Sequence, residues 1–240
     1  MSHLAVPVAG GNRKIPTRPR LRTKACMVFR IGTLESIMTR TSHSHPLRID
    51  SVICNDGVIG LTFAPGKCSS SIFGADWQRS LEVDLDAVRD WGADMVVTLL
   101  EAEEMVDLSI PDLGAGVKAR DMIWLHLPIP DGEAPRAEWW ALWRDSSLAA
   151  HHILDKGGRV LVHCRGGLER AACIAALIQI ERGVSLPRSL SHIGKARPGA
   201  VPLPAQSGFL SRACKGSGCR VGGGGPLRIS RGSGTGCAPW

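Results

Sequence analysis

The sequence predicts an α/β fold with a mostly parallel central sheet flanked by helices. Short apolar runs of strand length alternate along the chain with longer runs of helix length, which is the order that βαβ units produce. Three apolar runs, at 93–100, 122–127 and 159–163, are typical of strands that are buried in a parallel sheet. In such sheets functional residues lie at the carboxyl ends of the strands.

The elements follow in order from local signals. Strands are expected over 47–53 and 58–63, joined by a turn at Asn55-Asp56-Gly57. Asp76 is expected to cap a helix over 77–91 that carries Leu81, Leu85 and Val88 on one face. Pro111 starts a short helix, and Gly157 follows a long one. The helices after residue 100 are expected over 101–108, 111–119, 136–156, 171–182, 186–196 and 204–212.

Charge and composition divide the chain into three parts. Residues 1–40 carry eight Lys/Arg and one acid, and residues 211–240 carry five Lys/Arg and no acid, so the net charge of +7 belongs to the ends. We expect a basic, disordered extension over 1–40, one domain over 41–212 and a Gly-rich flexible tail over 213–240. Met38 is either the natural start of the protein or lies at the end of a genuine basic arm.

The same features narrow the class of protein. The basic ends lack interleaved aromatic residues, so no nucleic-acid partner is expected. No run approaches 18 apolar residues, and the N-terminus lacks a clean signal peptide, so we expect no membrane association and a cytoplasmic location. Eight cysteines in a chain this long do not suggest a disulfide framework. The sequence is silent on oligomeric state.

The chain is organised around one stretch, Arg159 to Arg170, that predicts a strand, a glycine-bearing loop and a helix start. Backbone N–H groups and the positive end of the helix dipole meet in such a loop, which forms an anion site and favours a thiolate at Cys164. Arg170 can fold back and hold two phosphate oxygens with its planar guanidinium. The C-x5-R spacing therefore places a nucleophile beside a phosphate site.

The spacing alone is not specific, because Cys214 and Arg220 have it too. That second copy has neither a strand before it nor a helix after it, and we interpret it as chance. Cys214, Cys219 and Cys237 match no zinc pattern well, so no metal and no cofactor are expected.

A thiolate that attacks phosphorus also needs a proton donor for the leaving group. Asp131 is the best candidate, because it follows a strand and lies among prolines and a glycine that would let the loop close. Glu133 and Asp121 are poorer candidates: Glu133 points away if Asp131 points in, and Asp121 precedes a strand.

These residues resemble a known family. His163-Cys164-x5-Arg170 resembles the signature loop of the cysteine-dependent protein tyrosine and dual-specificity phosphatases. Further motifs over about residues 39–210 resemble the kinase-associated phosphatase family, the cyclin-dependent kinase inhibitor-three type, in bacterial form: Gly60-Leu61-Thr62-Phe63-x-Pro65-Gly66-Lys67, Trp91-Gly92-Ala93, Val97-Thr98-Leu99-Leu100-Glu101, Pro128-Ile129-Pro130-Asp131 and Arg197-Pro198-Gly199-Ala200.

The resemblance implies a role for each site residue. Cys164 is then the nucleophile, Arg170 binds phosphate and Asp131 is the general acid. His163 orients the loop and tunes the thiolate, and Gln206 falls where related enzymes have a glutamine near the hydrolytic water. The loop that binds the substrate phosphate is made of Arg165, Gly166, Gly167, Leu168, Glu169 and Arg170.

Two residues depart from the family pattern and leave two functions open. Glu169 replaces a glycine, so its carboxylate would repel phosphate and its side chain would strain a backbone shaped for glycine. Ala171 replaces a Ser or Thr whose hydroxyl helps to expel the thiolate. The expected function is a protein phosphatase for phosphotyrosine or phosphoserine/threonine that works through a phosphocysteine intermediate, with a phosphorylated protein as partner. The alternative is a weakly active or inactive pseudophosphatase that binds phosphoproteins.

Overall fold

The computed structural model describes residues 39–70 and 74–216. Its centre is a five-stranded sheet in the order β2-β3-β8-β6-β7. Only β2 runs antiparallel to its neighbour, and β3, β8, β6 and β7 are parallel, which confirms the mostly parallel sheet. The strands are β2 (Asp50–Cys54), β3 (Gly57–Phe63), β6 (Met95–Thr98), β7 (Ile123–His126) and β8 (Arg159–Cys164).

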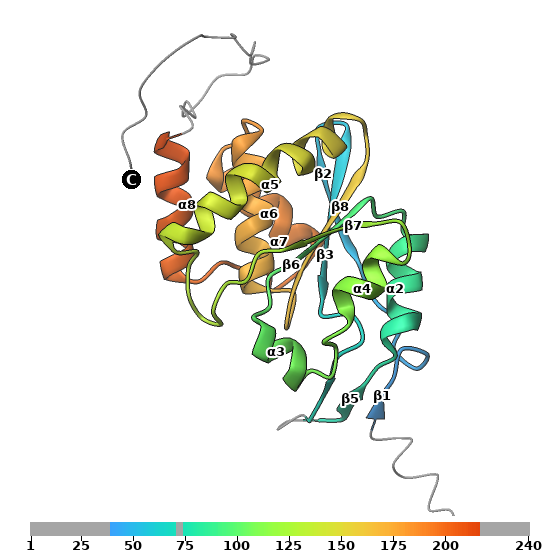
Figure 1. The fold of residues 1–240 in the computed structure, drawn as a ribbon. Coiled ribbons are helices and arrows are strands. Elements are labelled where there is room, and N and C mark those ends of the chain that lie inside the picture. The colour runs from blue at the N-terminus through green and yellow to red at the C-terminus, as the bar shows by residue number, and fades with distance from the viewer. Residues whose placement is uncertain (1–38, 71–73, 217–240) are drawn as a thin grey trace, which may run out of the picture.

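Helices cover both faces of this sheet (Figure 1). One face packs on α5 (Ala137–Asp155) and α6 (Glu169–Glu181), with α7 (Leu186–Ala196) and α8 (Pro204–Gly216) beside α6. The other face packs on α2 (Leu81–Asp90), α3 (Ala102–Asp107) and α4 (Leu113–Lys118).

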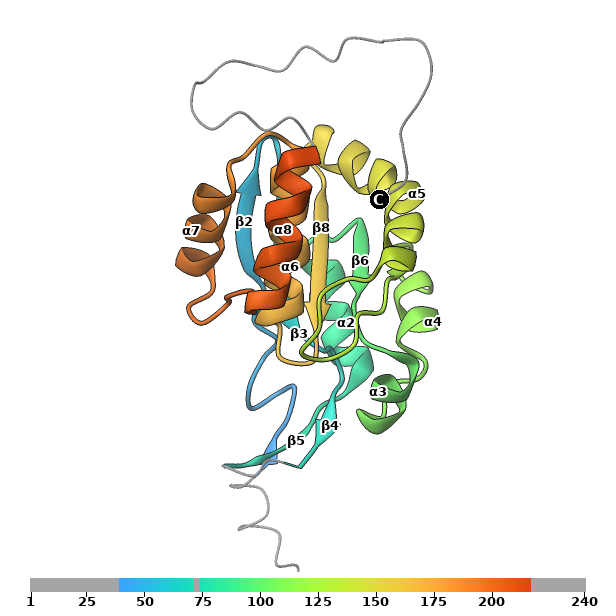
Figure 2. The same ribbon diagram turned by 90° about the vertical axis from the view of Figure 1, so that its left-hand side faces the viewer.

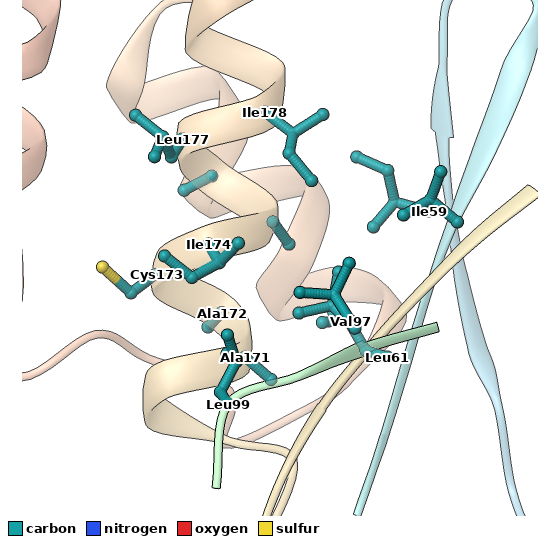
Figure 3. Close-up of a cluster of buried hydrophobic side chains, with 14 of the residues drawn as sticks. Ile59, Leu61, Val97, Leu99, Ala171, Ala172, Cys173, Ile174, Leu177 and Ile178 are labelled. Atoms are coloured by element: carbon teal, nitrogen blue, oxygen red, sulfur yellow. The ribbon is translucent and has the colours of Figure 1, made fainter. Parts of the chain in front are cut away.

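Helix α6 is the most deeply buried of the described helices, with all but its two terminal residues buried. Its apolar side chains are buried all round, because the sheet lies on one side and α7 and α8 lie on the others. Figure 3 shows this helix beside the strands, with Ala171 and Ile174 near Leu99 and Val97. A helix that is apolar on every side belongs in a core. Its first turn is therefore held firmly at the end of β8.

A second, small sheet lies beyond one end of the central sheet (Figure 2). It contains β1 (Thr39–Arg40), β5 (Asp76–Gln78) and β4 (Cys68–Ser69) in the order β1-β5-β4. The sequence analysis did not predict it. Its position follows from the chain path, because β4 comes five residues after Phe63, the last residue of β3. It therefore lies near the carboxyl ends of the parallel strands.

Several predicted boundaries need correction. Asp76 does not cap a helix, because it lies in β5 and α2 begins after Ser80, whose hydroxyl accepts the N–H of Val83 at 3.4 Å. Helix α6 begins at Glu169, two residues earlier than expected. The turn at Asn55 is confirmed, and that residue has a φ of 57°.

The division into extension, domain and tail stays a prediction. Thr39 and Arg40 form β1, and α8 continues to Gly216, so ordered elements cross both expected boundaries. The expectations for Met38, for the rest of the basic extension, and for Cys219, Arg220 and Cys237 lie outside the described residues.

Candidate active site

Cys164 is the last residue of β8, and α6 begins five residues later at Glu169. The Cys164 side chain is buried, and its Sγ accepts the N–H of Gly167 at 3.2 Å. Gly167 has a φ of +68°, and a Cβ at this position would lie 2.2 Å from the carbonyl oxygen of Thr62. Only glycine fits such a backbone so close to β3. The loop is thus packed against the strand that pairs with β8.

The carbonyl groups of this loop are held on its outer side. The carbonyl of Arg165 accepts the N–H of Ala64 at 3.4 Å, and that of Gly166 accepts Nη2 of Arg197 at 3.1 Å. In a trans peptide the next N–H points the opposite way. The N–H groups of Gly166 and Gly167 are therefore directed away from these contacts, as the bond from Gly167 to the sulfur shows. A loop of this kind binds anions.

Arg170 is buried and is held by the protein on one edge of its guanidinium. Nη1 donates to Oε2 of Glu104 at 2.6 Å and to the carbonyls of Ile129 at 2.9 Å and Leu99 at 3.4 Å. Nη2 donates to Oε1 of Glu104 at 2.9 Å, and it lies 2.9 Å from Oδ1 of Asp131. A bidentate carboxylate fixes both the position and the plane of the guanidinium.

The other edge of the guanidinium is suited to phosphate. Nε of Arg170 makes no hydrogen bond to any residue within 39–70 and 74–216. In the same part of the chain, Nη2 contacts two carboxylates, its anchor Glu104 and Asp131. Nε and Nη2 form the fork that takes two oxygens of one phosphate. An incoming phosphate would therefore displace Asp131 from Nη2 and leave its carboxylate beside the bound ester.

Asp131 lies on the loop between β7 and α5, and its side chain is 66% exposed. The structure thus brings Asp131, Arg170 and Cys164 into one site, although Asp131 comes from a different segment of the chain than the other two. Glu133, the poorer candidate, is turned to Arg136 at 2.7 Å. Asp121 precedes β7 and so lies at the opposite end of that strand from Asp131.

Gln206 contacts the Asp131 loop. Its Nε2 donates to the carbonyl of Glu133 at 2.9 Å, and its Oε1 accepts the N–H of Leu203 at 3.0 Å. Both ends of this buried amide are engaged by main chain, so it ties the first turn of α8 to the loop that carries Asp131. A place beside the hydrolytic water stays a prediction for this residue.

His163 is buried beneath the loop and belongs to a chain of polar groups across three strands. Trp124 Nε1 donates to Thr98 Oγ1 at 2.9 Å, and Thr98 Oγ1 lies 2.8 Å from His163 Nε2. Burial lowers the pKa of His163 to about 3, and the charge of Arg170 acts in the same direction. The backbone of Cys164 acts in the opposite direction and raises the pKa of His163. Nδ1 of His163 nevertheless makes no hydrogen bond of regular geometry among the described residues.

A neutral imidazole fits this chain of polar groups. With its indole N–H on the oxygen of Thr98, Trp124 leaves the threonine proton free to bond Nε2 of His163. The ring proton then lies on Nδ1, on the side of the Cys164 backbone. The sequence analysis predicted a supporting role for His163 but missed Thr98 and Trp124.

Glu104 is a further site residue that was not predicted from the sequence. Burial acts to raise its pKa, but the hydrogen bonds from Arg170 and the Glu101 amide, with the charges of Arg170 and Arg165, outweigh burial and lower the pKa. Glu104 therefore stays a carboxylate and keeps its hold on the arginine. It lies 66 residues before Arg170 in an acidic run, so no sequence spacing connects the two.

The two departures from the family pattern have different settings. Glu169 is half-buried in the first turn of α6 and does not have a positive φ, so the expected backbone strain is absent. A carboxylate in the first turn stabilises a helix, because it interacts with the positive end of the helix dipole. The same carboxylate would weaken the attraction of this helix end for a phosphate. Ala171 is fully buried in the core beside Leu99 (Figure 3).

Comparisons with known proteins agree with this geometry. Residues 74–184 match the model of a family described as "Polymorphic toxin system, DSP-PTPase phosphatase". Mouse cyclin-dependent kinase inhibitor 3 is 25% identical over 168 residues, which cover 68% of this chain and 74% of that protein. Human dual specificity phosphatase 28 is 31% identical over 101 residues, which cover 42% of this chain and 54% of that protein.

The chain is similar to members of the dual-specificity phosphatase superfamily. Among solved structures, it is similar to the active form of Tk-PTP, with 26% identity, a TM-score of 0.53, and coverage of 69% of this chain and 97% of the other. Kinase-associated phosphatase, with serine in place of its catalytic-site cysteine, has the same fold at 20% identity with a TM-score of 0.62, over 73% of this chain and 98% of the other.

Two further searches concern the described residues alone. Within 39–70 and 74–216, no helix is long and apolar enough to span a membrane. In the same part of the chain, no three His, Cys, Asp or Glu side chains gather as metal ligands would.

Proposed function

We propose that this protein hydrolyses phosphate monoesters on phosphorylated proteins, at tyrosine or at serine and threonine, through a phosphocysteine intermediate. The observation that carries the proposal is the arrangement around Arg170. Glu104 holds one edge of its guanidinium, and Asp131 lies 2.9 Å from Nη2 on the edge that would face an incoming phosphate. Cys164 lies at the base of the same loop, with an N–H directed at its sulfur.

Each step of the proposed reaction has a group in place. The Cys164 thiolate attacks phosphorus, the bond from phosphorus to the ester oxygen breaks, and that oxygen takes a proton from Asp131. A water then attacks the phosphocysteine and gives a proton to Asp131, the bond from sulfur to phosphorus breaks, and phosphate leaves with the thiolate restored. Loop N–H groups and Arg170 hold the phosphate oxygens in both steps.

The substrate class rests on the relatives. Cyclin-dependent kinase inhibitor 3, dual specificity phosphatase 28 and kinase-associated phosphatase support a phosphorylated protein as partner. A cytoplasmic location remains part of the proposal, because a catalytic thiol needs a reducing compartment. Cys54, Cys68, Cys164 and Cys173 are free thiols.

The experiment is phosphate release from an aryl phosphate by the wild type and by Cys164→Ser. We expect release by the wild type and none above background by the variant, because serine at this position does not supply a thiolate. Equal release by the two proteins would contradict the proposal.

The alternative, a phosphoprotein-binding module, is favoured by one observation. Glu169 places a carboxylate in the first turn of α6, where the positive end of the helix dipole would otherwise attract a phosphate most strongly. Glu169→Gly distinguishes the two functions. A large gain in turnover would indicate an intact catalytic site that the carboxylate weakens, whereas phosphopeptide binding without turnover in either form would support the binding module.

A further inference from the structure

Lys67 is a buried lysine in the turn between β3 and β4, and nothing above assigns it a role. Only 9% of its surface is exposed. Its ammonium lies 4.6 Å from the ring centre of Phe63 and 4.5 Å from that of Trp77. It forms no ion pair with a carboxylate in the described part of the chain. A buried lysine without a carboxylate partner is costly and calls for another source of negative charge.

The turn that carries Lys67 is fixed by a buried ion pair. The N–H of Gly66 donates to Oδ2 of Asp84 at 2.7 Å, and Asp84 accepts Nε of Arg79 at 2.7 Å and Nη2 at 2.8 Å. A Cβ on Gly66 would lie 2.6 Å from the backbone of Leu81. The side chain of Lys67 therefore leaves a rigid part of the backbone.

This geometry directs the ammonium at the phosphate loop. Nζ of Lys67 lies 3.5 Å from the carbonyl oxygen of Arg165, the residue that follows the expected nucleophile. Phe63, whose ring lies under the ammonium, pairs with Cys164 in the register of β3 and β8. Lys67 directly precedes β4, so the lysine approaches the nucleophile loop from the side of the small sheet.

The charged groups around Lys67 are three arginines and the thiol of Cys164. Burial and the positive charges of Arg79, Arg165 and Arg197 lower its pKa to about 8, and among the described groups Cys164 acts to raise it. Arg79 is neutralised by Asp84 and Arg197 by Asp50, at 2.7 Å in each pair. The anion that Lys67 lacks is thus the Cys164 thiolate or a phosphate bound above it.

We propose that Lys67 is a positioning residue of the phosphate site, one that holds the carbonyl of Arg165 outward and supplies the positive charge that favours the Cys164 thiolate. The proposal rests on the proposed function for its effect on turnover, but not for its effect on the thiol. The other role open to Lys67 is packing alone, since its ammonium over two rings contributes to stability.

The experiment measures the reactivity of Cys164 directly. Wild type, Lys67→Met and Lys67→Arg are treated with iodoacetamide from pH 5 to 9, and alkylation is followed by mass spectrometry of the tryptic peptide 160–165, in which Cys164 is the single cysteine. Iodoacetamide reacts with the thiolate. Lys118→Met is the matched control, because Lys118 also lies over a ring, Trp124 at 5.4 Å, but near the start of β7.

We expect Lys67→Met to alkylate about tenfold more slowly at pH 6, because the loss of one nearby positive charge makes the thiolate form of Cys164 less favourable. Lys67→Arg keeps the charge and should alkylate at close to the wild-type rate. Above pH 8 the wild type should lose kcat/KM as Lys67 loses its proton, while Lys67→Arg should not, because arginine stays charged.

Alkylation of Cys164 in Lys67→Met at the wild-type rate across the whole pH range would overturn the proposal and leave a packing role. If Lys67→Met does not fold, the comparison of wild type with Lys67→Arg decides between the two roles. A fall in kcat/KM above pH 8 that occurs in wild type but not in Lys67→Arg supports the proposal, and the same fall in both overturns it. A wild type that releases no phosphate, but whose Cys164 alkylation depends on Lys67, would contradict the proposed function and support this inference.

Discussion

Arg170 has most of its hydrogen bonds made by the protein before any phosphate arrives. Its partner Glu104 is buried on one side and comes from α3, a helix of only six residues. The cost of burying this charge is offset by the bidentate geometry and by the two carbonyl acceptors. The site is therefore a rigid arginine, with one edge held by Glu104 and the other in contact with the displaceable Asp131.

Glu104→Gln should weaken this anchor. A glutamine cannot accept two charged hydrogen bonds, and bonds to charged groups contribute about 1.5–3 kcal/mol each, so we expect kcat/KM to fall about 10- to 100-fold. Glu103→Gln, on the exposed side of the same helix, is the control and should behave as wild type. Equal kcat/KM for Glu104→Gln and wild type would show that Arg170 does not need this partner.

His163 should make the fold sensitive to acid. Its pKa is about 3 in the folded protein against 6.5 for an unperturbed histidine, so the unfolded chain binds the extra proton first as pH falls. The stability that this group contributes is complete above pH 6.5 and is lost between pH 6.5 and 3. It amounts to about 1.4 kcal/mol per pH unit in that window.

The measurement is the free energy of unfolding in urea at pH 7.5 and pH 5.5. Wild type should lose about 1.4 kcal/mol more between the two values than His163→Gln, which has no proton to take up. His152→Gln, at an exposed position on α5, should keep the wild-type dependence. The same loss in His163→Gln and wild type would assign the acid sensitivity to other groups.

At the scale of the element, the phosphate loop depends on how closely it packs against β3. Two adjacent glycines differ sharply in their surroundings. A Cβ on Gly167 would meet the carbonyl of Thr62 at 2.2 Å, whereas a Cβ on Gly166 would meet only the Leu168 side chain at 3.9 Å. The two positions form a natural pair for a test of the loop.

Gly167→Ala should damage the site and Gly166→Ala should not. The positive φ alone costs alanine about 1–2 kcal/mol, and the clash with β3 adds to it. We expect Gly167→Ala to lower the melting temperature and to slow phosphate release at least about tenfold. Gly166→Ala should release phosphate at a rate within a factor of about three of wild type. Similar behaviour of the two variants would contradict the packing of the loop on β3.

The sequence predicted the elements that carry their own local signal. Three buried strands and α7 stand close to where their apolar runs and proline indicate, and the strand-loop-helix at Cys164 is where its glycines place it. It did not predict β5, because the three residues of this strand are held by pairing with two other short segments, 39–40 and 68–69, and carry no apolar pattern of their own. Glu104, Thr98 and Lys67 were missed for the same reason, since each acts on the site through a contact far along the chain.

At the scale of the whole molecule, the topology gathers the site. The parallel strands β3, β8, β6 and β7 all end at one edge of the sheet, and the segments that follow them carry Lys67, the phosphate loop, Glu104 and Asp131. The small sheet lies beyond the same edge (Figure 2). Lys67 and Arg170 thus meet the carboxylates and the thiol in one place, although these groups come from four separate segments of the described chain.

Ala171 determines which step of the whole reaction should be slow. No hydroxyl is present at this buried position to help the thiolate leave, so breakdown of the phosphocysteine should limit turnover. Ala171→Ser should raise the steady-state rate and reduce the initial burst of product. An unchanged rate and a linear time course in both proteins would show that hydrolysis of the intermediate is not limiting.

The central claim is that Cys164 carries the phosphate during turnover. The direct measurement is acid quench of the wild type within its first turnover on an aryl phosphate, followed by mass spectrometry of peptide 160–165. We expect one added phosphate on Cys164, a burst of aryl alcohol close to the enzyme concentration, slower formation of both in Asp131→Asn, and neither signal in Cys164→Ser. Phosphate release by the wild type with no phosphate on this peptide at any quench time, and with equal release by Cys164→Ser, would contradict it.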